Sequence, residues 1–207
     1  MVESQLRAGG VLDRRVLAAM GQVPREIFVP EDRSSLAYID AVHILDKGTG
    51  RFLSDPTTFA RLVQLAKVGA DDRVLDVGAG TGYSTAVLAA LAREVVGLEA
   101  DARLAEIAQT NISRLTPSNA QIVSGDEAGL GDAQFEVILI EGAVDAIPDA
   151  LLKRLTDGGR LVALIREGGV GVATLVQRTG DDFQREASFN ASLPPLDPRP
   201  SGDVFVF

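Results

Sequence analysis

The sequence predicts an α/β protein built on a doubly wound, mainly parallel sheet. Five short apolar runs alternate with segments of helical periodicity, which is typical of parallel strands joined by crossover helices. Two further apolar runs follow the fifth and predict an antiparallel addition to the sheet. The expected parallel strands lie at 74–77, 95–98, 121–123, 135–140 and 160–165, and the late strands lie at 172–177 and 183–193.

The chain is organised around a stretch that joins the first of these strands to a helix. Directly after 74–77 come the alternating glycines Gly78, Gly80 and Gly82, and an Ala/Leu-rich helix is expected at 83–92. Strand, glycine turn and helix open a nucleotide-binding βαβ unit, where a ligand approaches bare backbone at the helix N-terminus. The spacing does not fit two standard forms. A dinucleotide fingerprint needs glycine where Tyr83 stands, and a P-loop needs a Gly-Lys-Ser/Thr sequence, which is absent.

Length and composition limit the functional classes. A chain of 207 residues, 46% hydrophobic and 24% charged, suits one globular domain. Its formal net charge of −9 disfavours a nucleic-acid partner, because phosphate contacts need clustered Lys and Arg. The absence of cysteine excludes disulfides and a thiol nucleophile, and the single His43 excludes a His-rich metal cluster. Without an apolar run of membrane-spanning length or a signal-like N-terminus, we expect a cytoplasmic monomer that uses neither metal nor membrane.

The first forty residues predict two helical pieces separated by Gly9-Gly10. Asp13 is placed to cap the second piece, and the proline-containing segment 23–30 ends it. A further helix is expected from Thr57 to about Lys67, with Asp55 as its N-cap.

Downstream of the glycine turn, two more helices are expected. One begins at the cap Asp101 and runs to about Leu115, and the other runs from Ile147 to Leu155. A tight turn at 157–159 leads into the fifth strand. The prolines of 194–200 predict an extended tail, and 204–207 is expected to pair at a sheet edge.

The run from Asp76 to Gly82 is similar to motif I of the S-adenosylmethionine-dependent methyltransferases, in which the loop wraps the methionine part of the cofactor. Glu99 ends the second strand, and a carboxylate at that strand tip can accept two hydrogen bonds from a ribose diol. The alternative is an ordinary tight turn beside a surface acid.

A second resemblance covers nearly the whole chain and thins after about residue 166. The string from Gln5 through Val23-Pro24-Arg25-Glu26-Ile27-Phe28-Val29-Pro30 to Asp40 resembles the N-terminal region of protein-L-isoaspartate O-methyltransferases. In that family the next loop reads roughly G-x-G-Q-T-I-S-Q-P. Here Gly48, Gly50, Ser54 and Pro56 match it, whereas Arg51 and Phe52 replace the Gln-Thr pair. The segment from Ile147-Pro148 to Gly158-Gly159-Arg160 is also like the family.

The resemblance implies a Rossmann-like methyltransferase domain over 1–207, with a helical and acceptor-loop region at 1–56, a cofactor core at 57–166 and C-terminal strands at 167–207. It implies methyl transfer from S-adenosylmethionine to the carboxylate of L-isoaspartyl residues in damaged proteins or peptides, with Ser54 as the active-site serine. We expect Asp76 to be hydrogen-bonded to loop amides or to lie near the cofactor ammonium group, because a lone buried carboxylate is costly. The expected cofactor-binding residues are Asp76, Gly78, Gly80, Gly82, Tyr83, Glu99, Ala100, Asp126 and Glu127.

Several residues keep two interpretations at this stage. Ser54 is either the hydroxyl that holds the acceptor or a plain loop residue, and Arg51 either meets a substrate carboxylate or is solvated. Phe52 is expected to narrow the acceptor entrance. Glu141 stands where the family has a small polar residue, so it either repels an anionic acceptor, serves a different one or faces water. His43 is expected to be a partly packed loop residue rather than a catalyst.

Two rival functions follow from these departures. One is an enzyme of the same fold that methylates a different acceptor, and the other is a relative that binds the cofactor without turnover. For the repair reaction itself no general base is needed, because a carboxylate with a pKa near about 4 is already ionised at neutral pH.

Overall fold

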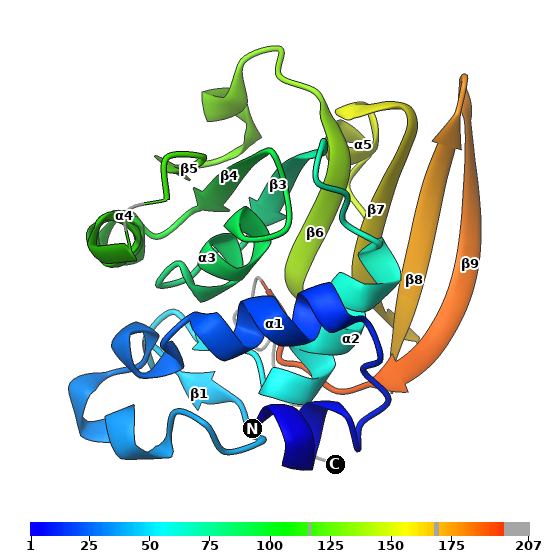
Figure 1. Ribbon diagram of the computed structural model, residues 1–207. Helices are drawn as coiled ribbons and strands as arrows, with labels where there is room; N and C mark the ends of the chain where they lie inside the picture. The colour runs from blue at the N-terminus through cyan, green and yellow to red at the C-terminus, as the bar shows by residue number, and fades with distance from the viewer. Residues whose placement is uncertain (116, 168–169, 197–207) are drawn as a thin grey trace, which may run out of the picture.

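A seven-stranded sheet forms the centre of the molecule (Figure 1). The computed structural model describes residues 1–115, 117–167 and 170–196. The strand order is β5-β4-β3-β6-β7-β8-β9, in which β3 to β7 pair in parallel and β8 and β9 add antiparallel at one edge. This confirms the predicted fold class. The strands are β3 (Arg73–Val77), β4 (Glu94–Glu99), β5 (Ala120–Ser124), β6 (Phe135–Val144), β7 (Leu155–Glu167), β8 (Val170–Thr179) and β9 (Asp182–Ala191).

The predicted N-caps are confirmed. The Asp13 carboxylate accepts from the backbone of Arg15 and Val16 and begins α1 (Arg14–Gln22). Asp55 accepts from Thr58 N at 2.7 Å and begins α2 (Pro56–Ala66). The other α-helices are α3 (Tyr83–Ala89), α4 (Ala102–Leu115), whose Leu104 N donates to Asp101, and α5 (Asp149–Leu152).

Other local expectations differ from the structure. The first N-terminal piece is a short π-helix, η1 (Val2–Leu6), and 3-10 turns η2 (Arg25–Phe28) and η3 (Glu31–Leu36) follow α1. The helix expected to reach Leu155 ends at Leu152, and the expected tight turn at 157–159 lies inside β7. There the pairing with β6 shifts register, and Gly158 takes a φ of 76°, so the glycines allow a bulge instead.

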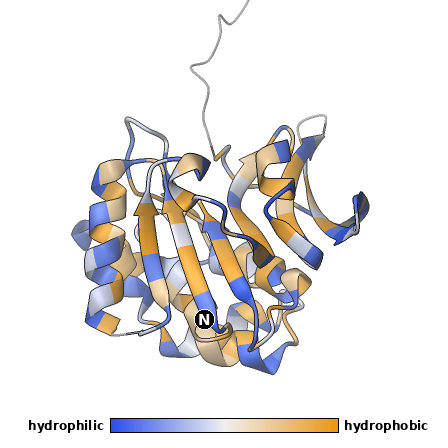
Figure 2. Cartoon of the chain, turned by 90° about the horizontal axis from the view of Figure 1, so that it is seen from above, coloured by the Kyte–Doolittle hydropathy of each residue, from blue (hydrophilic) through white to orange (hydrophobic). Residues whose placement is uncertain are grey.

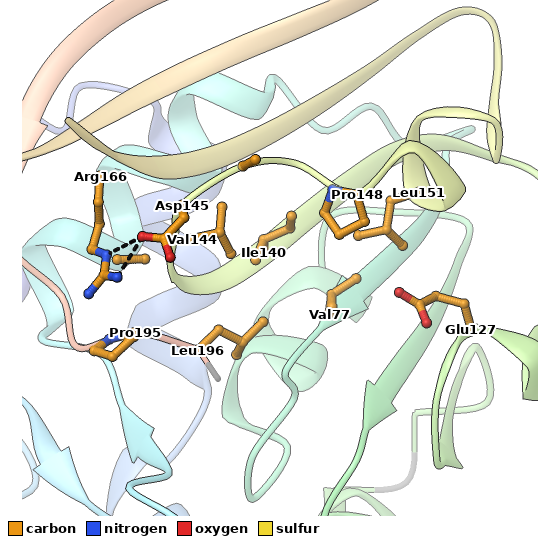
Figure 3. A pocket seen from close by; sticks show the side chains of 12 residues that line it. Val77, Glu127, Ile140, Val144, Asp145, Pro148, Leu151, Arg166, Pro195 and Leu196 are labelled. Atoms are coloured by element: carbon orange, nitrogen blue, oxygen red, sulfur yellow. Dashed lines mark hydrogen bonds and ion pairs between the residues drawn. The ribbon is translucent and has the colours of Figure 1, made fainter. Parts of the chain in front are cut away.

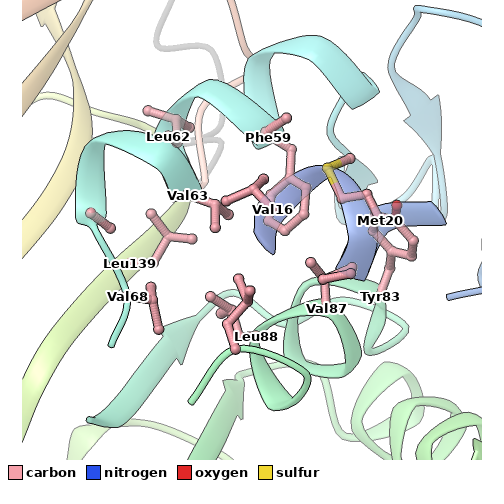
Figure 4. Packing of buried hydrophobic residues seen from close by; sticks show 14 of the residues in the cluster. Val16, Met20, Phe59, Leu62, Val63, Val68, Tyr83, Val87, Leu88 and Leu139 are labelled. Atoms are coloured by element: carbon pink, nitrogen blue, oxygen red, sulfur yellow. The ribbon is translucent and has the colours of Figure 1, made fainter. Parts of the chain in front are cut away.

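Helices cover the two faces of the sheet unequally. On one face α1, α2 and α3 pack on the central strands through a large apolar cluster (Figure 4). The opposite face carries only the short α5 and the 3-10 turn η4 (Glu127–Leu130), which bury a smaller cluster. The apolar stretches run along the strands between these layers (Figure 2). Within the described ranges no helix is long and apolar enough to cross a membrane.

A two-stranded antiparallel sheet, not predicted from the sequence, lies beside the helical layer. It pairs β1 (His43–Ile44) with β2 (Phe52–Leu53). Phe52 is buried in the larger apolar cluster, so the expectation that its ring narrows an entrance is wrong. Because β2 is fixed by this ring and by pairing with β1, it sets the positions of its neighbours Arg51 and Ser54.

The segment after β9 returns to the centre of the sheet. Ala143 N donates to Pro194 O at 3.0 Å, and Leu196 N donates to Ala143 O at 2.9 Å. Leu196 therefore lies beside β6, next to the end of β3. The expected strand at 204–207 and the tail prolines Pro198 and Pro200 lie outside the described residues.

Candidate active site

The sheet reverses its direction of growth between β3 and β6. The chain builds β4 and β5 on one side of β3 and then crosses back to place β6 on the other side. Ligands of open α/β sheets bind at the carboxyl ends of the strands at such a switch point. Gly78 follows β3 directly, and Glu141 lies in β6 near this end, so both predicted regions meet at the switch point.

The glycine loop needs its glycines. Gly78, Gly80 and Gly82 have φ angles of 89°, 57° and 95°, in the left-handed region that side chains rarely adopt. A Cβ on Gly78 would lie 2.4 Å from Leu196 Cδ1, and one on Gly82 would lie 3.3 Å from Ala108 of α4. Gly78 thus keeps space open at the site, whereas Gly82 allows close packing between helices.

Glu99 is fully buried at the tip of β4 and holds the glycine loop. Its Oε2 accepts from Gly80 N at 2.6 Å, and its Oε1 accepts from Asp101 N at 3.0 Å. Arg51 also donates to Oε2, at 2.5 Å. The expectation that Arg51 is solvated or faces the acceptor is therefore wrong for this structure, in which its guanidinium is buried against Glu99.

A cavity of about 500 Å³, which we call the Glu99 cavity, opens over the loop. Five of the predicted cofactor residues line it, namely Gly78, Glu99, Ala100, Asp126 and Glu127. The remaining lining residues are Thr49, Arg51, Val77, Leu98, Asp101, Gly125 and Leu196. Asp126 also accepts from Ala128 N at 3.0 Å and so caps η4.

Asp76 lies beneath the cavity rather than in its wall. It is fully buried, and its Oδ2 accepts from the hydroxyls of Ser84 at 2.7 Å and Thr85 at 2.5 Å. The expected hydrogen bonds to loop amides are therefore replaced by bonds to the first turn of α3. Burial raises the pKa of Asp76 to about 6, although the two hydroxyls counteract the shift.

Tyr83 is also behind the cavity wall. Its ring packs between Phe28 and Phe59, with centroid distances of 5.5 and 5.6 Å, and the Arg25 guanidinium lies 4.6 Å from its centroid. The ring therefore builds the core on the side of Ser54, away from the residues that line the Glu99 cavity.

Ser54 is buried, and its Oγ has no hydrogen-bond partner among the described residues. Because Asp55 caps α2, the hydroxyl is not used as the helix cap. The Ser54 carbonyl accepts from Arg25 Nη2, and Arg25 Nε donates to Ala37 O at 2.8 Å. Arg25 thus fixes the backbone at Ser54 while the Ser54 hydroxyl stays available.

Arg25 is a site residue that sequence reasoning missed. It is fully buried and pairs with no carboxylate within the part of the chain that the structure describes. Burial lowers the pKa of its guanidinium. The available signal was its place in a compact apolar segment between Pro24 and Pro30, where an arginine must find buried acceptors.

Glu141 completes the polar cluster. It is buried rather than facing water, and Asp76, Arg25 and Arg51 all act on it electrostatically. Burial raises the pKa of Glu141 well above its usual range, and the neighbouring Asp76 carboxylate raises it further. The following buried side-chain atoms around this centre have no hydrogen-bond partner in the described ranges: Arg25 Nη1, Arg51 Nε, Ser54 Oγ, Asp76 Oδ1, Tyr83 Oη and Glu141 Oε1. Buried polar groups without partners are rare in proteins and indicate a place built for a ligand.

We predict that Glu141 makes the folded protein less stable at high pH. The folded state binds the Glu141 proton more tightly than the unfolded chain, whose carboxyl has a pKa of about 4.5. The stabilisation is thus complete below about pH 4.5 and is lost as the pH rises through the folded-state value. Urea denaturation at pH 5 and pH 8 should show a smaller loss of unfolding free energy in Glu141→Gln than in the native chain. Glu186→Gln, on the exposed side of β9, should keep the native loss; an equal loss in Glu141→Gln would contradict the prediction.

A second cavity of about 400 Å³ lies on the other side of Leu196, and we call it the Ile140 cavity (Figure 3). Ile140, Pro148 and Leu151 form an apolar wall, and Pro195 and Leu196 lie opposite them (Figure 3). Arg166 and Asp145 form an ion pair at one end. Val77, Glu127 and Leu196 line both cavities, so Leu196 acts as a partition between them.

The comparisons with known proteins agree with this geometry. A model of the protein-L-isoaspartate(D-aspartate) O-methyltransferase (PCMT) family matches residues 1–192. The chain belongs to this family. A protein-L-isoaspartate O-methyltransferase of Koribacter versatilis is 37% identical over 198 residues, covering 95% of this chain and 88% of the relative. One of Halorhodospira halophila is 38% identical over 194 residues, covering 92% and 87%. The resemblance inferred from the sequence is confirmed.

Solved structures of PCMT proteins share the fold. One protein-L-isoaspartate O-methyltransferase has a TM-score of 0.77 at 26% identity, covering 92% of this chain and 63% of that chain. A Plasmodium falciparum protein described as a PCMT, in complex with S-adenosyl-L-homocysteine, has a TM-score of 0.78 at 24% identity, covering 93% and 94%. The fold of this PCMT member is therefore the methyltransferase fold expected from the glycine loop.

Proposed function

We propose that this protein transfers a methyl group from S-adenosylmethionine to the carboxylate of L-isoaspartyl residues in damaged proteins or peptides. The observation that carries the proposal is the meeting of two halves at the switch point. One half is the glycine loop with Glu99, and the other is Ser54 with the partnerless polar atoms around Arg25 and Glu141. The family of the chain gives the acceptor.

The first half fits the cofactor. Gly78 exposes backbone to the Glu99 cavity, whose volume of about 500 Å³ lies in the range of small-molecule sites. Glu99 offers a buried carboxylate to a ribose diol, and Asp126 and Glu127 line the part of the cavity where the base would bind. When bound, S-adenosylmethionine supplies an electrophilic methyl group.

The second half fits an anionic acceptor. Ser54 Oγ is free to donate to an acceptor carboxylate, and the Arg25 guanidinium holds the Ser54 backbone while adding positive charge nearby. The acceptor carboxylate is ionised at neutral pH, so these residues need only hold one oxygen in line with the methyl group and exclude water. The methyl ester then cyclises to a succinimide without a further protein group, as the repair reaction requires.

The reaction is tested with two peptides that differ only in one linkage. Labelled S-adenosylmethionine is incubated with a peptide that contains an isoaspartyl residue and with its normal aspartyl twin. We expect base-labile label on the isoaspartyl peptide alone. Equal labelling of both peptides, or of neither, would contradict the acceptor assignment.

Ser54→Ala is expected to slow methylation by about 10- to 100-fold at saturating cofactor, because it removes a hydrogen bond to a charged acceptor. Stability should change by less than about 1 kcal/mol, since Asp55 and not Ser54 caps α2. Single-turnover rates and urea denaturation measure the two effects. Ser113→Ala, on the exposed side of α4, is the matched control, and native turnover by Ser54→Ala would remove Ser54 from the mechanism.

The setting of the enzyme also belongs to the proposal. We infer a single methyltransferase domain that works as a cytoplasmic monomer. The net charge of −9 supports a protein or peptide partner rather than a nucleic acid.

A further inference from the structure

Arg51 occupies the position that the proposed function reserves for a ligand. Its Nη2 donates to Glu99 Oε2 at 2.5 Å, and its Nη1 donates to the Leu196 carbonyl at 3.0 Å. The exposed fractions of the two side chains in this ion pair are 10% for Arg51 and 0% for Glu99. Arg51 thus joins the acceptor loop, the tip of β4 and the returning C-terminal segment.

Hydrogen-bond capacity shows that this arrangement competes with a diol. A carboxylate has about four acceptor positions, and Glu99 uses three of them, for Gly80 N, Asp101 N and Arg51. A ribose diol brings two donors. The two backbone amides are fixed by the loop and the helix start, whereas the Arg51 side chain can rotate. Binding of the diol therefore requires Arg51 to give up its position.

The released guanidinium has other acceptors close by. A Cβ placed on Gly78 would lie 3.2 Å from Arg51 Nη2 and 3.6 Å from Glu141 Cβ, so Arg51 and Glu141 flank the same point over the loop. Arg51 Nε, Asp76 Oδ1 and Glu141 Oε1 are buried without partners in the described part of the chain. A turn of the guanidinium away from Glu99 brings donors toward these two carboxylates and toward Ser54.

We propose that Arg51 is a positioning residue that couples the two substrates. Without cofactor it pairs with Glu99; when the ribose takes Glu99, the guanidinium turns to the side of Glu141 and adds positive charge where the acceptor carboxylate binds. The cofactor then binds first and prepares the acceptor pocket. This inference rests on the proposed function, since it needs both substrates at this site.

Calorimetry with S-adenosylhomocysteine tests the first half of the proposal. Arg51→Gln removes the competitor and should bind S-adenosylhomocysteine at least about fivefold more tightly than the native chain. In the Glu99→Gln background the same change should have no effect, because Arg51 competes only through Glu99. Arg185→Gln, exposed on β9, changes the net charge equally and should bind as the native chain does.

The second half is tested by acceptor binding. Saturating S-adenosylhomocysteine should tighten the binding of an isoaspartyl peptide to the native chain at least about fivefold, and this coupling should vanish in Arg51→Gln. Weaker or unchanged S-adenosylhomocysteine binding in Arg51→Gln would overturn the proposal, as would coupling that persists in that variant. If Arg51→Gln does not fold by thermal denaturation, Arg51→Lys replaces it and should bind more tightly than native, because lysine loses the forked contact. A native chain that binds no S-adenosylhomocysteine would instead reject the proposed function.

Discussion

Glu99→Gln is expected to weaken the binding of S-adenosylhomocysteine by about 1.5–3 kcal/mol, at least tenfold, because the diol loses a charged hydrogen-bond acceptor. Glutamine keeps the size of the side chain and leaves one oxygen for Gly80 N or Asp101 N, so the loop keeps part of its support. Isothermal titration calorimetry measures the affinity directly.

The matched control lies at the opposite end of the same strand. Glu94 begins β4 and forms a half-exposed ion pair with Arg73 at 3.1 Å, so Glu94→Gln removes the same charge far from the cavity. Its affinity for S-adenosylhomocysteine should equal the native value. If Glu99→Gln and Glu94→Gln bind alike, Glu99 does not hold the ribose.

Arg25→Ala is expected to lower the unfolding free energy by about 3–5 kcal/mol, because it leaves a cavity and removes donors from the buried carbonyls of Ala37 and Ser54. For a chain of this size the melting temperature should fall by roughly 6–20 °C. Thermal and urea denaturation give the two values.

Two further variants separate packing from hydrogen bonding. Arg25→Met fills most of the volume but cannot donate, so it should lie between Arg25→Ala and the native chain. Arg33→Ala, on the exposed η3, should change stability by no more than about 0.5 kcal/mol. Native stability of Arg25→Ala would show that the buried guanidinium does not hold the backbone at Ser54.

Elements defined by neighbouring residues could be predicted from the sequence. The parallel strands, the glycine loop and the caps Asp13, Asp55 and Asp101 depend on local patterns, and the structure has them. Asp76 could have been placed more accurately, because Ser84 and Thr85 lie one helical turn beyond the loop that returns the chain to β3.

Contacts between distant segments could not be predicted in this way. Arg51 and Glu99 are separated by 48 positions, and their pairing depends on β1 and β2, which are each only two residues long. The burial of Phe52 has the same origin. Leu196 reaches Gly78 only because the chain returns to β6 after two antiparallel strands. Such positions follow from the packed tertiary structure and leave no local pattern.

The central claim is a division of labour, in which Glu99 holds the cofactor and Ser54 holds the acceptor. Single-turnover methylation of one isoaspartyl peptide, measured over a range of S-adenosylmethionine concentrations, tests it most directly. Glu99→Gln should approach the native rate as the cofactor concentration rises, whereas Ser54→Ala should stay about 10- to 100-fold slow at every concentration. Recovery of Ser54→Ala at high cofactor, with Glu99→Gln remaining slow, would contradict the account.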